Sequence, residues 1–119
     1  MLKRIKFLAV PVKDQDRALA FYTQKVGLRV FTDQTLGPMR WIELQIPGAE
    51  TMLVLHHKPQ HVPSDKEPAV ALEADNVQAT YDELKARGVE FVQPPKKEHW
   101  GTYAAFKDSE GNLVMFSKS

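Results

Sequence analysis

Short apolar segments bounded by Gly, Pro, Asp and Ser recur along this chain, a pattern typical of β-strands. Two stretches show a helical period instead. Their apolar stripes are formed by Leu19, Tyr22 and Val26 in the first stretch and by Val77, Tyr81 and Leu84 in the second. The pattern therefore predicts two helices, each set among strands.

The two helices belong to an internal repeat. The repeated segments are residues 7–31 and 69–92. Asp14 corresponds to Asp75 and Gly27 to Gly88, which gives a period of about 61 residues, half the chain. The two aspartates are predicted to cap the helix N-termini, because a carboxylate there accepts from free backbone N–H groups. The two glycines are predicted to end the helices in the left-handed conformation.

Further strands are expected after each helix. They lie at about 28–33, 39–46 and 51–57 in the first half, and at about 89–93, 102–107 and 112–117 in the second. The segment 94–98 is expected to be a stiff surface connector. The sequence thus predicts one α+β domain, 1–119, with two β-α-β-β-β modules that form a curved mixed sheet with the helices outside. Module 1 covers about 1–58, the linker about 58–67 and module 2 about 68–119.

Successive side chains of a strand point to opposite faces of the sheet, and this alternation assigns the strand residues to two faces. The helix-facing set is strongly aliphatic and comprises Leu8, Val10, Val12, Ile42, Leu44, Ile46, Leu53, Leu55, Val70, Leu72, Val114 and Phe116. The opposite set mixes aromatic, small and polar residues and comprises Phe7, Ala9, Trp41, Glu43, Gln45, Met52, Val54, His56, Ala69, Ala71, Glu73, Tyr103, Ala105, Leu113 and Met115. Such a mixture resembles the lining of a small-molecule pocket. A contact with the other half or with another subunit is the alternative.

Several residues of the mixed face have side chains that could bind or react. Trp41, Trp100 and Tyr103 are candidate stacking walls for a planar ligand. Glu43 and His56 lie on neighbouring predicted strands with the same facing, so they could orient a ligand or act as a general acid/base pair. Glu43 would favour a cationic or hydrogen-donating group.

Composition excludes several classes of function. The chain has 119 residues, 43% hydrophobic and 26% charged, which fits one globular domain. The net charge of +1 carries no basic excess, so we expect no nucleic-acid partner. The absence of cysteine excludes disulfides and thiolate chemistry. The short apolar run 7–12 is too short for a signal sequence or a membrane span, so a cytoplasmic protein without a membrane partner is expected.

A set of short motifs, in order along the chain, resembles the vicinal-oxygen-chelate superfamily of glyoxalases, extradiol dioxygenases and bleomycin-resistance proteins. The motifs are FYTQKVGL at 21–28, RWIEL at 40–44, LKARGVEF at 84–91, Trp100-Gly101 and FKDSEGN at 106–112. The resemblance spans essentially the whole chain. It implies two β-α-β-β-β modules and a homodimer.

The resemblance also designates four metal-ligand positions, which the family's enzymes fill with His and Glu. Carried over by spacing, they fall here on Phe7, Val54, Ala69 and Met115. None of these offers nitrogen or oxygen to a metal, and Met115 offers only a soft thioether. The pattern is therefore closer to the bleomycin-resistance type, and no metal and no cofactor are expected.

The leading interpretation is a protein that binds a small, partly planar organic molecule without a metal. The candidate ligand-binding residues are Phe7, Trp41, Glu43, Val54, His56, Ala69, Trp100, Tyr103 and Met115. One alternative is an enzyme, either a metal-dependent isomerase, lyase or dioxygenase with displaced ligands, or a metal-free acid/base catalyst that uses Glu43 and His56. Another is an interaction protein whose mixed face is filled by a partner subunit.

Overall fold

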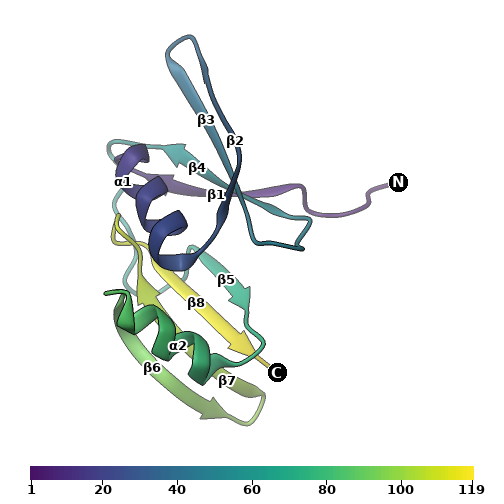
Figure 1. Cartoon of the computed structure of the whole chain (residues 1–119), viewed down its shortest axis with the longest axis vertical. Helices are drawn as coiled ribbons and strands as arrows, with labels where there is room; N and C mark the ends of the chain where they lie inside the picture. The colour runs from purple at the N-terminus through teal and green to yellow at the C-terminus, as the bar shows by residue number, and fades with distance from the viewer. The chain divides into compact units, whose positions relative to one another are not determined.

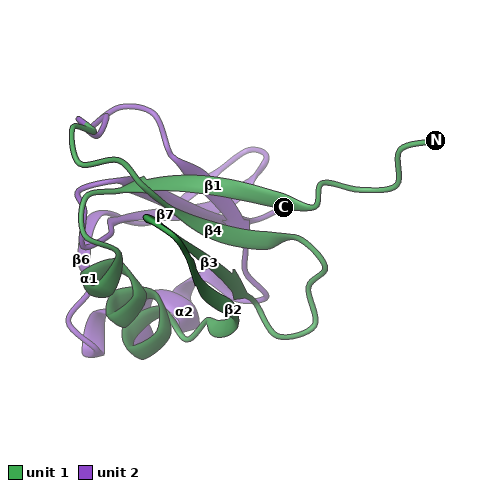
Figure 2. Cartoon of the chain, turned by 90° about the horizontal axis from the view of Figure 1, so that it is seen from above, with its two compact units in different colours: residues 1–61 green, residues 62–119 purple.

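The chain folds into two units with the same order of elements. A computed structural model describes all residues, 1–119, and divides them into residues 1–61 and 62–119 (Figure 2). Each unit runs strand, helix, strand, strand, strand (Figure 1), so the two predicted β-α-β-β-β modules are confirmed.

The first unit has a mixed four-stranded sheet in the order β1-β4-β3-β2. Its elements are β1 (Phe7–Val12), α1 (Gln15–Ala20), η1 (Phe21–Val26), β2 (Arg29–Leu36), β3 (Met39–Gln45) and β4 (Met52–His57). β1 runs parallel to β4, and the other pairs are antiparallel. α1 packs against β4, so one face of this sheet is covered by the helix.

The second unit repeats the arrangement, with the strand order β5-β8-β7-β6. Its elements are β5 (Val70–Glu73), α2 (Val77–Ala86), β6 (Glu90–Glu98), β7 (Gly101–Lys107) and β8 (Leu113–Lys118). β5 runs parallel to β8, whereas β7 is antiparallel to both of its neighbours. α2 packs against β6, β7 and β8.

The helix ends follow local side-chain chemistry, with one correction. Asp14 caps α1 as predicted, because its Oδ1 accepts from the backbone N–H of Arg17 at 3.0 Å. The predicted cap of α2, Asp75, is wrong: Asn76 has the extended backbone of a cap, and its Oδ1 accepts from Ala79 N at 2.9 Å. The second helix starts one residue later than the repeat suggests, since either side chain can serve as a cap. The stop at Gly27 is confirmed by its φ of 91°.

The first helix does not stay an α-helix throughout. From Phe21 to Val26 it widens into a π-helix, η1, which ends at Gly27. At the junction the Thr23 hydroxyl donates to the Leu19 carbonyl at 2.7 Å, a bond that competes with the regular helix ladder. The side chain of Tyr22 is fully buried, so the apolar stripe still reaches the core through the wider turn.

Two strands are longer than the sequence indicates. β2 continues to Leu36, which leaves Gly37-Pro38 as the turn. The connector predicted at 94–98 is wrong, since β6 runs through both prolines to Glu98. Proline is tolerated there because β6 is an edge strand, where an N–H can be missing without loss of a ladder bond. Register shifts between Phe91 and Lys96 absorb the irregular backbone.

The helix-facing aliphatic residues form most of the core of each unit, as predicted. The fully buried members are Val10, Val12, Ile42, Leu44, Leu55 and Val114. Leu8 and Ile46, at strand ends, are exceptions with 43% and 38% of their surface exposed. Burial of this set stabilises each unit by about 25 cal/mol per Å² of apolar surface removed from water. Neither α-helix of the chain has the length and apolar character that crossing a membrane requires.

Candidate functional site

The face of the first sheet that points away from α1 carries an aromatic pair. We call this surface the first open face, and it is formed by Phe7, Ala9, Trp41, Glu43, Gln45, Met52, Val54 and His56. Phe7 on β1 and Trp41 on β3 meet edge to face, with ring centroids 5.4 Å apart and planes at 84°. Phe7 is 39% exposed and Trp41 is half-buried, so the pair offers an aromatic surface to solvent.

Glu43 lies in the middle of this face. Strand register pairs Glu43 with Val54 on β4, and Val54 with Ala9 on β1. The Glu43 side chain has no hydrogen bond or ion pair in the structure, and no buried side-chain oxygen lacks a partner, so its carboxylate is accessible to solvent. Val54 is only 1% exposed, so it supports the face and offers almost no surface to a ligand.

His56 and Glu43 are not joined as an acid/base pair in this structure. His56 lies on the same face of β4 as Val54, two residues beyond the position that pairs with Glu43. Its exposed side chain has no hydrogen bond to Glu43 or to any other group. The arrangement provides two separate polar groups at an aromatic surface.

The second unit has an aromatic pair on its own open face. We call this surface the second open face, and it is formed by Ala69, Ala71, Glu73, Trp100, Tyr103, Ala105 and Met115. Trp100 and Tyr103 stack with centroids 5.7 Å apart and an interplanar angle of 25°. Trp100 is 43% exposed in the two-residue turn that joins β6 to β7.

Small side chains surround Met115 on the second open face. The register places Met115 between Ala71 on β5 and Ala105 on β7. Met115 itself is half-buried. Ala69 is exposed just before β5, where its N–H donates to the Leu113 carbonyl at 2.8 Å. The predicted ligand-binding residues therefore fall into two groups. The first unit contains Phe7, Trp41, Glu43, Val54 and His56, and the second unit contains Ala69, Trp100, Tyr103 and Met115.

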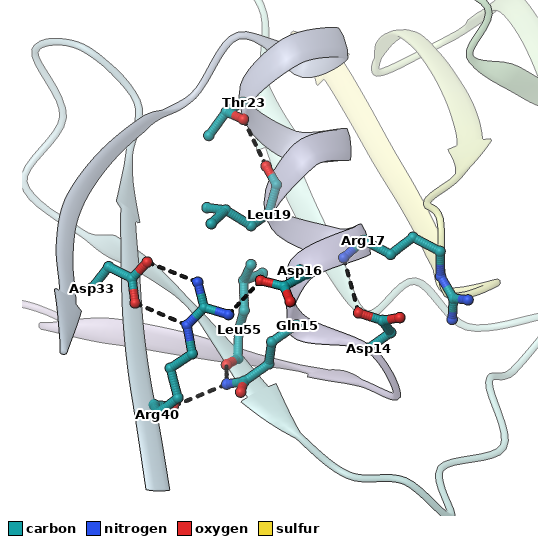
Figure 3. A network of polar contacts seen from close by, with 9 residues as sticks. All are labelled: Asp14, Gln15, Asp16, Arg17, Leu19, Thr23, Asp33, Arg40 and Leu55. Atoms are coloured by element: carbon teal, nitrogen blue, oxygen red, sulfur yellow. Dashed lines mark hydrogen bonds and ion pairs between the residues drawn. The ribbon is translucent and has the colours of Figure 1, made fainter. Parts of the chain in front are cut away.

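Behind the first open face lies a polar network that the sequence patterns did not reveal (Figure 3). The side-chain amide of Gln15 donates to the carbonyls of both Arg40, at 2.9 Å, and Leu55, at 3.0 Å. These two hydrogen bonds connect α1 to β3 and to β4, close to the residues through which the two strands pair. Nothing in the local pattern marks Gln15, because its partners are backbone groups 25 and 40 residues away.

Arg40 is the centre of an ion network on the helix side of the sheet. Its guanidinium donates to both carboxylate oxygens of Asp33, at 3.0 and 2.9 Å, and to Asp16 at 2.5 Å (Figure 3). The hydrogen bond from Arg40 lowers the pKa of Asp33, and the two carboxylates raise the pKa of Arg40. The network joins the β2–β3 hairpin to α1 and holds the strand that carries Trp41.

The four positions designated by the resemblance offer neither nitrogen nor oxygen to a metal. Phe7, Val54 and Ala69 have hydrocarbon side chains, and Met115 has a thioether. Elsewhere in the chain, no three His, Asp or Glu side chains lie close enough together to hold a metal ion.

The chain is thus a repeated β-α-β-β-β protein with an aromatic pair in each of its two units. The family model of the Glyoxalase/Bleomycin resistance protein/Dioxygenase superfamily matches residues 4–116. The chain belongs to this superfamily.

Similar proteins span the whole chain. The protein YetH of Bacillus subtilis (strain 168) is 38% identical over 120 residues, which cover 99% of this chain and 100% of YetH. The crystal structure of UcmS2 superposes with a TM-score of 0.88 at 34% identity, and 100% of both chains is covered. TnmS3, an antibiotic binding protein from Streptomyces sp. CB03234, superposes with a TM-score of 0.86 at 33% identity, covering 98% of this chain and 95% of TnmS3.

Proposed function

We propose that this protein binds a small, partly planar organic molecule on its open sheet faces, without a metal and without catalysing a reaction. The observation that carries the proposal is the exposed aromatic pair Phe7–Trp41 on the first open face. Aromatic surface exposed on a sheet face costs free energy in water, and that cost is recovered when a flat ligand covers it. The Trp100–Tyr103 stack provides a second surface of the same kind.

Two further observations support a binding role. The four designated metal positions have no nitrogen or oxygen ligand, so the Lewis-acid chemistry of the family's enzymes has no ligands at its usual place. TnmS3, at 33% identity over nearly the whole chain, is an antibiotic binding protein. We include in the proposal that the protein is a homodimer, as the resemblance implies, and that it is cytoplasmic.

The test is a titration of Trp41→Ala with a planar probe. The probe is naphthalen-1-ylmethanol, a neutral fused-ring alcohol, and binding is followed through backbone amide and Trp indole shifts in 1H–15N spectra. Loss of the indole wall should weaken binding by up to about tenfold, because one aromatic contact contributes about 0.5–1.5 kcal/mol. The control is Val62→Ala, which removes an 84% exposed apolar side chain in the second unit, outside the first open face. Equal affinity of Trp41→Ala and wild type would contradict the assignment.

Metal analysis of the same preparation separates the enzyme alternative. Tag-free protein purified without chelators should contain substoichiometric transition metal. About one equivalent per chain would instead favour a metal-dependent enzyme with ligands at other positions.

A further inference from the structure

Glu43 is an unusual residue for the centre of an aromatic surface. It is half-buried, and its carboxylate has neither a hydrogen bond nor an ion pair, although the polar Thr32 on β2 and the apolar Val54 on β4 lie opposite it in register. A carboxylate without a protein partner is free to pair with a positive charge on a ligand, because no cationic side chain of the protein already holds it.

The neighbours of Glu43 leave room for such a ligand. The side chains beside it on β4 and β1 are the buried Val54 and the small Ala9. Two residues along β3, on the same face, lies Trp41, whose ring meets Phe7. A carboxylate next to an aromatic wall is a combination that favours an organic cation, because both the charge and the ring face attract it.

Other charged groups near this face do not neutralise Glu43. Arg29 pairs in register with Gln45, but it forms no ion pair with Glu43. His56 on the same face also has no contact with Glu43. The structure therefore leaves one accessible carboxylate at the aromatic pair.

We propose that the first open face selects planar ligands that carry a protonated amine, with Glu43 as the group that recognises the ammonium and Phe7 and Trp41 as the aromatic wall. This inference rests on the proposed binding function and names the chemical class of its ligand. Glu43 thus determines specificity, whereas the aromatic pair provides the shared affinity for flat molecules.

The experiment compares three probes that differ in one group. Naphthalen-1-ylmethylammonium, naphthalen-1-ylmethanol and 1-naphthoate share the ring system and are cationic, neutral and anionic at neutral pH. Each is titrated into the wild type, Glu43→Gln, Glu43→Asp and Glu50→Gln, and followed by 1H–15N shifts of β1, β3 and β4. Glu50→Gln is the matched control, since it removes the same charge from an exposed position between β3 and β4.

The ammonium probe should bind the wild type about tenfold more tightly than the alcohol, and the naphthoate should bind most weakly. Glu43→Gln should remove the preference of the protein for the ammonium probe over the alcohol probe. Glu43→Asp and Glu50→Gln should keep the preference.

The remaining outcomes separate the two proposals. Equal binding of the ammonium and the alcohol, or tighter binding of the naphthoate, would overturn the cation preference and leave the binding function standing. A preference that persists in Glu43→Gln would overturn the role of Glu43. Absence of binding by all three probes would contradict both the cation preference and the proposed function.

Discussion

Gln15 is a single residue on which the arrangement of one unit depends. Its amide donates to two backbone carbonyls, one on β3 and one on β4, in a partly buried position (Figure 3). A partly buried carbonyl that loses its donor costs more free energy than the average hydrogen bond contributes, because its desolvation is no longer compensated. The two strands that it joins carry Trp41 and Val54.

We expect Gln15→Met to destabilise the protein. The substitution keeps the length of the side chain and removes both donors, so the free energy of unfolding should fall by about 1–3 kcal/mol. Urea unfolding measures the change. The control is Gln24→Met, an exposed position in η1 without a hydrogen bond, which should change the free energy of unfolding by less than about 0.5 kcal/mol. The same loss in both variants would show that the bridge does not stabilise the fold.

At the scale of elements, helix caps and edge strands explain where the predictions succeeded and failed. The repeat correctly placed Asp14 at the start of α1, but in the second half the cap is Asn76 and not Asp75. Both side chains suit a cap, and only the backbone path decides which of two adjacent residues occupies it. The two prolines of β6 led to the wrong prediction of a connector at 94–98. An edge strand tolerates proline and a central strand does not, and the sequence pattern does not show which strand is at the edge.

The cap of α2 can be tested directly with two neighbouring substitutions. Asn76→Ala should lower the free energy of unfolding by about 1 kcal/mol, because the N–H of Ala79 loses its acceptor. Asp75→Ala should change it by less than about 0.5 kcal/mol, since Asp75 is exposed and accepts no hydrogen bond. Thermal or urea unfolding of both variants measures the difference. If Asp75→Ala lowered the free energy of unfolding more than Asn76→Ala, Asp75 would be the cap, as the repeat predicted.

At the scale of the whole molecule, acid stability reports on the ion network of the first unit. The hydrogen bond from Arg40 lowers the pKa of Asp33 below its ordinary value of 3.8. The folded state therefore binds a proton at Asp33 less readily than the unfolded state does. The resulting stabilisation is present above the unfolded pKa and is lost as the pH falls through the lowered folded pKa.

We therefore expect Asp33→Asn to have a flatter acid profile than the wild type. At neutral pH the variant should be less stable by about 1 kcal/mol, the upper range for an accessible ion pair. Below about pH 4 the difference should shrink, because the wild type loses the same interaction by protonation. Urea midpoints measured across the acid range test this. The control is Asp75→Asn, which changes an exposed carboxylate without a partner, and its urea midpoints should follow those of the wild type at every pH. A stability difference between Asp33→Asn and the wild type that stays constant with pH would contradict the linkage.

The two units also show what a repeat can and cannot conserve. Both keep the parallel pairing of the first and last strands and the antiparallel neighbours. The central row of the open face differs, however: Glu43, Val54 and Ala9 in the first unit correspond to Ala105, Met115 and Ala71 in the second. The shared scaffold thus carries two chemically different surfaces, and only the first contains a carboxylate in that row.

The sequence alone determined the modules, the helices and the faces of the strands. These depend on periodicity, which records burial one residue at a time, and Val10, Ile42 and Leu44 lie in the core as the alternation predicted. Tertiary structure decided the contacts between side chains of different strands. The Phe7–Trp41 edge-to-face pair, the unpartnered carboxylate of Glu43 and the Gln15 bridge all depend on strand order and register. The residues joined by the Phe7–Trp41 pair and by the Gln15 bridge lie 25 or more positions apart, and a local pattern contains no information on which distant residue will be the neighbour.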